Sequence, residues 1–463
     1  MYCGDETGSF IGDVGSKNSR FGYGGEDNPK LVFPSYVSNG HLVSSCLSSR
    51  TAEQEVESIL KVATTSDDPI TDPTEFLGHG DRVNNWDALE VAWNSSMETL
   101  RAKDPMKHAN QAAAGGNCVH PILAVTPGFT EYAGYGPNFC KAIQREDYSK
   151  MTEMLFESMG APAVFLAPST MLSAFSMGRQ TALIVDIGAG GCRVTPIVEG
   201  LVLENSQRRT GRGGEWMNHV TWKALLQEKV VPKPHYQVRS TSGNKSVVMA
   251  KSPLFHQWAM QELILEFRTG PHVKVDSWCQ DLRVPFTPPP SDSDDSSSGV
   301  PESPGPSQTS YTLPDGTEVD LSTPTGRDFC RIPELFFSDD VPFTSSPPSA
   351  NLKTLSDLPL QKLIQQSLLS VGDVDVRKDL AGCVCLVGNG SQGLEARLSA
   401  ELTSLLPTMA KPKVTASRNT VERSCAAWIG ASVLTSLGSF QQLWLSKTEY
   451  EEYGSSMAMQ RFP

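Results

Sequence analysis

The sequence contains no run of about 18 apolar residues, so no segment of it is predicted to cross a membrane as a helix. Its first residues, MYCGDETGSF, lack the basic stretch followed by an apolar run that marks a secretory signal peptide. Basic residues are also outnumbered, with 39 Lys and Arg against 52 Asp and Glu and a net charge of −13. Proteins that bind nucleic-acid backbone directly usually carry a basic surface. Without a signal peptide or a membrane-spanning segment, we expect an intracellular protein. Its acidic charge predicts that it does not bind nucleic acid sequence-specifically and reaches DNA only through partners.

Metal-binding and phosphate-binding motifs of the commonest kinds are missing as well. The ten cysteines are scattered, and the closest pair, Cys383 and Cys385, matches neither of the usual zinc spacings. Reduced thiols in a protein core explain them. No G-x-x-x-x-G-K-S/T occurs, which excludes a P-loop. A phosphate site in this chain must therefore be built from other glycine-rich turns.

At 463 residues the chain is long enough for two hydrophobic cores, since single cores rarely grow beyond about 250–300 residues. Residues 285–310 are mostly Pro, Ser and Asp and are predicted to be a disordered insertion. Phosphorylation could make this insertion a docking switch, or it could be a tolerated loop without a role. Shorter surface loops are predicted at residues 62–75, 110–117 and 341–351.

Between the loops, strand patterns alternate with helix patterns. Residues 147–159 place methionines and a leucine on one helical face, and Gly160 follows where a C-terminal cap belongs. Ser446 and Glu449 have the spacing of a capping box, which predicts a helix near the end of the chain. Three short apolar runs end in Pro, Asp or Gly, as buried strands do: Ile122–Val125, Leu183–Val185 and Val384–Val387. The alternation predicts an α/β architecture.

One local plan occurs twice, in residues 10–25 and 183–200. In each, an apolar strand runs into Asp-x-Gly, makes a tight turn of small residues and returns as a second strand. Glycines let backbone N–H groups approach phosphate oxygens, and Asp13 and Asp186 could hold a divalent cation through water. A single Asp-x-Gly is usually a plain turn. Two in matching contexts, with a third glycine-rich turn at residues 387–393, predict a nucleotide cleft between two related lobes.

Eight segments, taken in order, resemble the actin family. They are FGYGGEDNPKLVFPS (21–35), NNWDALEVAWNSS (84–96), HPILAVTP (120–127), MTEMLFESMGAPAVF (151–165), MGRQTALIVDIGAG (177–190), SYTLPDGTEV (310–319), RIPELFF (331–337) and AAWIGASVLTSLGSFQQLWLSKTEYEEYG (426–454). The resemblance implies the actin-like ATPase fold, an α/β fold with two lobes, each a mixed sheet flanked by helices, and a nucleotide cleft between them. Within the family, GED-x-P-K together with the D-x-G-S first turn is most similar to class four of the actin-related proteins.

The resemblance also implies four subdomains. Their expected ranges are 1–33, 80–177 and 422–463 for subdomain 1, 34–79 for subdomain 2, 178–212 and 341–421 for subdomain 3, and 213–340 for subdomain 4 with its insertion. Residues 38–78 are longer than the compact loop with which actin docks its neighbour in a filament. A filament needs one complementary surface repeated head to tail. We therefore expect a protein that does not polymerise.

Matching the motifs residue by residue implies a binding site for ATP with Mg²⁺ or Ca²⁺. Asp13 and Asp186 would contact the metal through water. The residues implied in nucleotide binding are Asp13, Gly15, Ser16 and Arg20 in the first turn, Asp186, Gly188 and Gly190 in the second, Gly388 and Gly390 in the third, and Lys274 in the adenine pocket.

The same match implies that no catalytic residue remains. Ser169 stands where actin has the glutamine that positions the attacking water, and Ala189 replaces an acidic residue that contacts the metal through water. Phosphoryl transfer depends on such positioning and charge, and losing one catalytic group commonly costs about 100-fold or more. Four further departures are Lys17, Arg193, Val275 and Ser424, in place of a glycine, a histidine, a glutamate and a lysine. We expect ATP to be a structural ligand that clamps the lobes, with little or no hydrolysis.

Class four of the actin-related proteins implies a role in the nucleus. Its members are subunits of chromatin remodelling and histone acetyltransferase complexes, bound beside monomeric actin on a long helix of the motor or scaffold subunit. A helix-binding groove is implied near Trp428, Leu443, Trp444 and Tyr450, although both tryptophans also fit an apolar core pattern. Histones are a further candidate partner. Two alternatives stay open: a divergent cytoskeletal actin, and a cytoplasmic actin-related protein of the dynein-activator type, either with weak ATPase activity.

Overall fold

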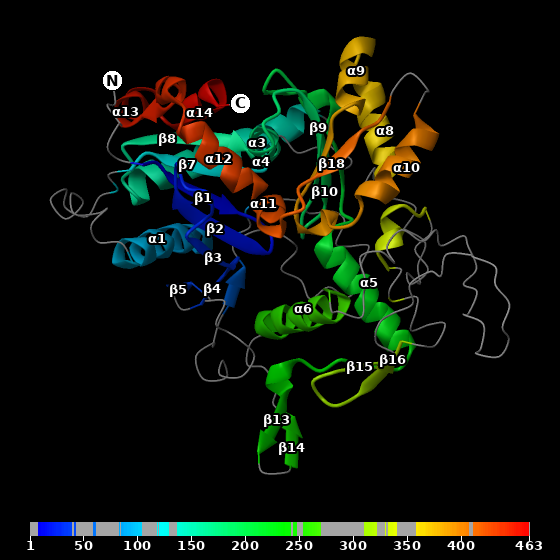
Figure 1. Ribbon diagram of the computed structural model, residues 1–463. Helices are drawn as coiled ribbons and strands as arrows, with labels where there is room; N and C mark the ends of the chain where they lie inside the picture. Colours follow the sequence, from blue (N-terminus) through cyan, green and yellow to red (C-terminus); the bar gives the residue numbers. More distant parts are fainter. Residues whose placement is uncertain are drawn as a thin grey trace.

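The computed structural model of the chain describes residues 8–38, 41–42, 59–61, 83, 85–103, 118, 120–128, 137–241, 244–247, 253–269, 310–321, 329, 332–339, 358–406 and 411–462. These residues form two lobes, each built on a mixed sheet flanked by helices (Figure 1). The predicted α/β fold class is therefore confirmed. The predicted loops at 62–75, 110–117 and 341–351 lie outside the described residues, as does the insertion at 285–310 apart from its last residue.

The sheet of the first lobe has the strand order β19-β8-β7-β1-β2-β3. Strand β7 lies between β1 and β8 and is parallel to both, and the remaining pairs are antiparallel. Every residue of β7 and β8 is buried, which explains their continuous apolar sequences. The strands are β1 (Phe10–Val14), β2 (Asn18–Tyr23), β3 (Leu31–Pro34), β7 (Ile122–Thr126), β8 (Ala163–Pro168) and β19 (Leu445–Ser446).

Helices from both ends of the chain pack against this sheet. The predicted helix at 147–159 is the second half of α3 followed by a π-helical turn, and it ends before Gly160, whose φ is +67°. Ser446 and Glu449 form the predicted capping box at the start of α13. The helices are α1 (Trp86–Lys103), α3 (Pro137–Glu153), η2 (Met154–Ser158), α4 (Ser169–Ser176), α11 (Thr420–Ser424), α12 (Ala426–Thr435), η9 (Gly438–Gln442), α13 (Lys447–Tyr453), η10 (Ser455–Met457) and α14 (Ala458–Arg461).

The sheet of the second lobe has the order β11-β10-β9-β17-β18, with β12 paired to β10. Its β9–β10 pair is antiparallel, like the β1–β2 pair, so the repeated hairpin predicted from the sequence is confirmed. The strands are β9 (Ala182–Ile187), β10 (Cys192–Val198), β11 (Leu201–Val202), β12 (Arg208–Thr210), β17 (Val384–Val387) and β18 (Val414–Ala416). The helices beside them are η3 (Glu204–Ser206), η6 (Ile332–Phe336), α8 (Leu360–Ser370), α9 (Val374–Ala381), η8 (Asn389–Ser391) and α10 (Glu395–Leu405).

Two long helices extend the second lobe away from its sheet, with small strand pairs beyond them (Figure 1). The helices are α5 (Gly214–Gln227) and α6 (Pro253–Thr269), with η4 (His235–Gln237) between them. The strand pairs are β13 (Val238–Thr241) with β14 (Asn244–Val247), and β15 (Ser310–Thr312) with β16 (Glu318–Asp320). A separate three-stranded sheet joins β4 (Tyr36–Ser38) to β5 (His41–Leu42) and β6 (Ile59–Lys61).

Buried apolar side chains form two separate clusters, one centred on each lobe, and the first also takes in residues of the second sheet such as Ile184 and Cys385. Phe10, Trp93 and Trp428 belong to the first cluster, and Trp216 and Phe336 belong to the second. Two cores agree with the prediction from chain length, whereas the division into four subdomains stays a prediction. No helix among the described residues is long and apolar enough to cross a membrane. All six cysteines that the structure describes are free thiols.

Candidate functional site

A cavity of about 550 Å³ lies between the lobes, lined by the turns of both hairpins. Ser169 and Ala189, the residues at the two catalytic positions, also line it. Lys274 lies outside the described residues. The structure brings together at this cavity the nine other residues predicted to bind nucleotide: Asp13, Gly15, Ser16, Arg20, Asp186, Gly188, Gly190, Gly388 and Gly390.

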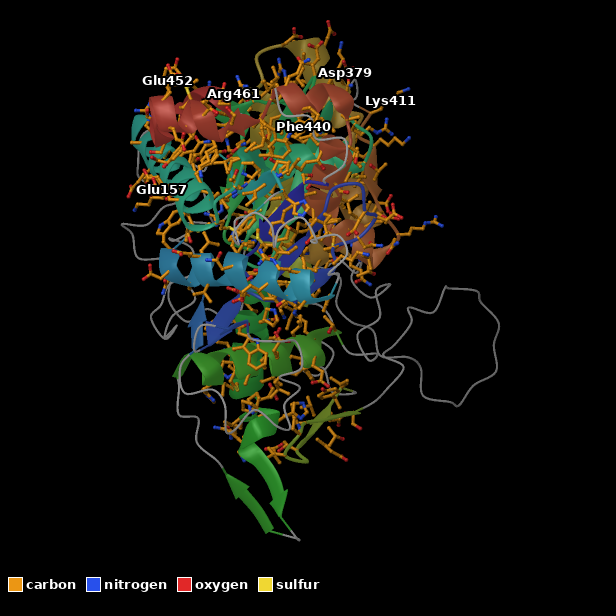
Figure 2. All side chains as sticks on the ribbon, turned by 90° about the vertical axis from the view of Figure 1, so that its left-hand side faces the viewer. Glu157, Asp379, Lys411, Phe440, Glu452 and Arg461 are labelled. Atoms are coloured by element: carbon orange, nitrogen blue, oxygen red, sulfur yellow. The ribbon has the colours of Figure 1, made fainter. Side chains whose placement is uncertain are left out.

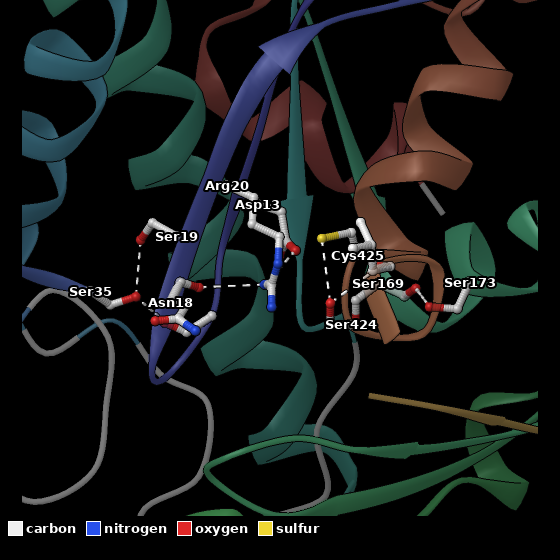
Figure 3. Close-up of polar contacts among 11 residues, drawn as sticks. Asp13, Asn18, Ser19, Arg20, Ser35, Ser169, Ser173, Ser424 and Cys425 are labelled. Atoms are coloured by element: carbon white, nitrogen blue, oxygen red, sulfur yellow. Dashed lines mark hydrogen bonds and ion pairs between the residues drawn. The ribbon is translucent and has the colours of Figure 1, made fainter. Parts of the chain in front are cut away.

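The first turn, between β1 and β2, is fixed by its own hydrogen bonds. The Gly15 N–H donates to the Asn18 carbonyl at 3.1 Å. The buried Ser35 hydroxyl donates to the Gly15 carbonyl at 2.6 Å and lies 2.9 Å from the Ser19 hydroxyl (Figure 3). The turn is therefore shaped by the protein before any ligand binds, which lowers the entropic cost of binding.

The second turn, between β9 and β10, is held by the start of α5. Within the turn, the Gly188 N–H donates to the Gly191 carbonyl at 2.9 Å. The N–H groups of Gly214 and Glu215 donate to the carbonyls of Gly188 and Ala189, both at 2.9 Å. A helix N-terminus carries partial positive charge. This charge lies beside the turn that would hold the phosphates.

The third turn requires glycine at position 388. Gly388 has φ +84°, and a Cβ there would lie 2.4 Å from the Ile187 carbonyl oxygen and 2.8 Å from Oδ1 of Asp186. Its N–H donates to the Arg423 carbonyl at 2.9 Å. The glycine thus lets the third turn pack directly against the strand that ends in Asp186.

An ion pair occupies the first turn's side of the cleft. Arg20 lies directly opposite Asp13 in the β1–β2 register, and its Nη1 is 3.1 Å from Oδ2 of Asp13 (Figure 3). The two side chains are only 14% and 13% exposed. Burial raises the pKa of the Asp13 carboxyl, and the Arg20 guanidinium opposes that rise. The acidic residue expected to hold a metal is therefore paired with a cation of the protein itself.

Two further contacts join the lobes. Lys17 of the first turn forms an ion pair with Glu262 of α6, with Nζ and Oε1 2.9 Å apart. Arg193 of β10 donates from Nη1 to the Pro127 carbonyl, just after β7, at 2.5 Å. Both basic side chains stand at positions where actin-family motifs have other residues, a glycine and a histidine. The departures seen in the sequence thus make contacts that join the two sides of the cleft.

The cavity contains two buried arginines that motif matching did not assign. Arg268, at the end of α6, is 6% exposed and donates from Nε to Oδ1 of Asn218 at 3.1 Å. Burial lowers its pKa to about 10, so it stays charged at neutral pH. Arg423 is 5% exposed and donates from Nη1 to the Ser417 carbonyl at 2.8 Å. Its buried Nε and Nη2 have no hydrogen-bond partner among the residues that the structure describes.

The charges around the cavity suit a polyanion. Six cationic side chains on the cavity lining face three carboxylates, and Glu262, which pairs with Lys17, reduces the formal excess to two positive charges: Lys17, Arg20, Arg193, Arg209, Arg268 and Arg423 against Asp13, Asp186, Glu215 and Glu262. A nucleoside triphosphate has the complementary charge and supplies many acceptors. Such acceptors would satisfy the buried N–H groups of Arg423, which are costly to leave unpaired. The residues present therefore fit a nucleotide.

The same residues do not fit a hydrated divalent cation. Mg²⁺ is normally held through its waters by carboxylates, and here Asp13 is paired with Arg20 while Ala189 offers no oxygen. No group of three or more His, Cys, Asp or Glu side chains among the described residues could hold a metal.

The predicted partner groove is divided between core and surface. Trp428 and Trp444 are 0% and 5% exposed and belong to the core of the first lobe, so they cannot contact a partner directly. Their burial agrees with the apolar core pattern of both and corrects only the expected place of the two tryptophans in the groove. Leu443 is 49% exposed. The Tyr450 hydroxyl donates to Glu157 at 2.6 Å, and its ring stacks on Phe156.

The C-terminal helices frame this surface. Figure 2 shows Arg461 and Glu452 on them and Glu157 below. Arg461 donates to the backbone carbonyls of Gln442, Leu443 and Trp444 at 3.1–3.3 Å. The exposed Leu443 side chain is therefore presented from a fixed backbone.

The family model for actin matches residues 4–463. The chain belongs to the actin family. It is 30% identical to actin-related protein 4 of Arabidopsis thaliana over 100% of both chains. The proteins of that name from Yarrowia lipolytica and Schizosaccharomyces pombe are both 29% identical, over 100% and 98% of this chain and 97% and 96% of theirs. Within the actin family, the chain is therefore of the actin-related protein 4 type.

Proposed function

We propose that this chain is a non-polymerising actin-fold subunit of a nuclear chromatin remodelling or histone acetyltransferase complex, and that ATP is its structural ligand. The proposal that ATP binds rests on the cleft, where three glycine turns surround a cavity with excess positive charge. The nuclear part is supported by the full-length similarity to proteins named actin-related protein 4.

Hydrolysis is expected to be slow or absent because the catalytic groups of actin have no counterpart here. Ser169 begins α4 and lines the cavity, but its side chain is too short to take the place of a glutamine. Ala189 cannot hold a metal-bound water. Arg193 donates to Pro127 of the other lobe instead of orienting an attacking water. Binding can outlast catalysis, since a ligand at 100 times its Kd stabilises a fold by about 2.7 kcal/mol.

The proposed partners are monomeric actin and a long helix of a remodelling motor or scaffold subunit, with histones as a further candidate. Leu443 is exposed beside the C-terminal helices, and Arg461 donates to its carbonyl, so this side chain is the one proposed to contact the partner helix. The net charge of −13 suits histones better than DNA. A cytoskeletal or cytoplasmic actin-related protein with weak ATPase activity remains the alternative, and similarity to actin-related protein 4 argues against it.

Affinity purification of the tagged full chain from nuclear and cytoplasmic extracts tests the proposal. We expect conventional actin together with a remodelling motor or acetyltransferase scaffold from the nuclear extract. Dynein-activator components, or self-association alone, would contradict the chromatin role. Nucleotide content is measured on the same material by extraction and chromatography. A chain that carries no nucleotide and shows no thermal shift with ATP would contradict structural ATP binding.

A further inference from the structure

We propose that the cleft holds the nucleotide's phosphates without a divalent cation, with the buried arginines Arg20, Arg268 and Arg423 supplying the counter-charge. This inference rests on the proposed nucleotide binding and specifies its chemistry. It follows from three features of the described residues: the Asp13–Arg20 ion pair, the alanine at position 189 and the cationic lining of the cavity.

The first feature is geometric. The β1–β2 register sets Arg20 opposite Asp13, so the ion pair at 3.1 Å is fixed by strand pairing and not by a flexible loop. Arg20 Nη1 also lies 3.5 Å from the Asn18 carbonyl, inside the same turn. For Asp13 to accept hydrogen bonds from the waters of a cation, this pairing would have to break, and a second positive charge would have to enter beside the guanidinium. Like charges at such distances repel strongly in a buried site.

The second feature is the loss of a carboxylate from the second turn. Ala189 accepts a hydrogen bond through its backbone carbonyl from Glu215, so the turn keeps its shape without the side-chain oxygen. A water-mediated metal site depends on several oxygens that orient the hydration shell. The second turn retains Asp186 alone for this purpose, while the first turn's Asp13 is already paired.

The third feature is that the protein supplies the charge a metal would bring. Arg20, Arg268 and Arg423 line the cavity and are mostly buried. Guanidinium groups match phosphate oxygens in geometry and remain charged at any physiological pH. With a formal excess of two positive charges, the cleft can neutralise about half of the charge of a triphosphate by itself.

Equilibrium binding of radiolabelled ATP to the nucleotide-depleted full chain tests the inference, in excess EDTA and in excess Mg²⁺. We expect ATP to bind in EDTA with an apparent Kd no higher than in excess Mg²⁺, because Mg²⁺ complexes free ATP and the cleft takes the nucleotide without the cation. Binding that appears only with Mg²⁺ would overturn the inference and leave the proposed nucleotide binding intact. No binding in either buffer would overturn both. This comparison uses the native chain and depends on no variant.

Two variants assign the effect to residues. Arg20→Gln is expected to weaken ATP binding about tenfold in both buffers, because a charge-assisted contact is lost. The matched control, Arg145→Gln, removes an exposed arginine on α3 and is expected to leave ATP binding unchanged.

The double variant Arg20→Gln/Ala189→Asp frees the carboxylate of Asp13 and adds one at position 189, so Mg²⁺ should strengthen its ATP binding about tenfold. A double variant indifferent to Mg²⁺, or an Arg20→Gln chain that binds normally, would overturn the roles given to these residues. Thermal unfolding without nucleotide identifies any variant that is misfolded.

Discussion

Lys17 and Glu262 form an ion pair across the cleft, with 2.9 Å between Nζ and Oε1. Lys17 belongs to the turn that cradles phosphate in the actin family, and Glu262 belongs to a helix of the other lobe. The Lys17–Glu262 ion pair and the Arg193–Pro127 hydrogen bond together link the lobes at two points. The two lobes are therefore joined at this cleft by contacts within the chain itself.

Breaking the Lys17–Glu262 pair should change the rate of nucleotide exchange more than it changes the free energy of unfolding. The side chains are 26% and 41% exposed, and exposed pairs contribute about 0.2–1 kcal/mol. We expect Lys17→Ala to change the free energy of unfolding by no more than this and to speed release of a fluorescent ATP analogue. Glu262→Gln should have the same effect, and the double variant should add nothing further. Additive effects in this double-mutant cycle would contradict a direct link.

Gly388→Ala should destabilise the protein substantially. The new Cβ would lie 2.4 Å from a backbone oxygen, in a backbone conformation with φ +84° that L side chains rarely adopt. A cost of about 2–3 kcal/mol is expected, measured by denaturant unfolding. Gly372→Ala is the control, because a Cβ there meets nothing within 4 Å. Equal effects at the two glycines would show that position 388 has no special requirement.

Trp428→Ala and Leu443→Ala should separate stability from partner binding. Trp428 is fully buried, and its truncation should cost about 3–5 kcal/mol. Leu443 is 49% exposed, so Leu443→Ala should leave the free energy of unfolding within about 0.5 kcal/mol. In a pull-down with the partner helix we expect that variant to lose about tenfold in affinity. Leu201→Ala, at a 66% exposed leucine of the other lobe, is the control and should bind normally.

The capping box at α13 should make the free energy of unfolding fall as the pH becomes acidic. The Ser446 N–H and hydroxyl donate to Oε2 of Glu449 at 2.9 and 2.7 Å, and these bonds lower the pKa of Glu449. A lowered folded-state pKa stabilises the protein above the unfolded value of about 4.3, and this stability is lost as pH falls through the folded value. Ser446→Ala should cost about 1 kcal/mol at neutral pH. Glu449→Gln should reduce the decline in stability between about pH 5 and 3 measured for the native chain; an unchanged decline would contradict this role.

Much of this architecture could be predicted from the sequence because local patterns determine it. Both Asp-x-Gly hairpins, strand Val384–Val387 and the Ser446–Glu449 cap lie where periodicity and turn chemistry placed them. Each depends on residues close together in the chain. Such features are the ones that single-sequence reasoning can reach.

The features that were missed depend on long-range packing or on strand register. The pairing of Arg20 with Asp13 follows from the register of β1 and β2, which motif matching does not give. Arg268 was missed because Lys274 was matched to the adenine pocket, while the fold brings the end of α6 to the cavity. The burial of Trp428 agrees with the apolar core pattern of its helix α12, whereas the expected partner groove depended on packing that the sequence does not give.

The order in which the chain builds its sheets has a consequence for biosynthesis. The second lobe's sheet is made entirely from residues between Ala182 and Ala416, whereas the first lobe's sheet and core also need β19, Trp428 and Phe462. During translation the central half of the protein can therefore complete its sheet while the earlier half still exposes apolar surface. Apolar surface exposed in this way makes a nascent chain prone to aggregation until its last segments emerge from the ribosome.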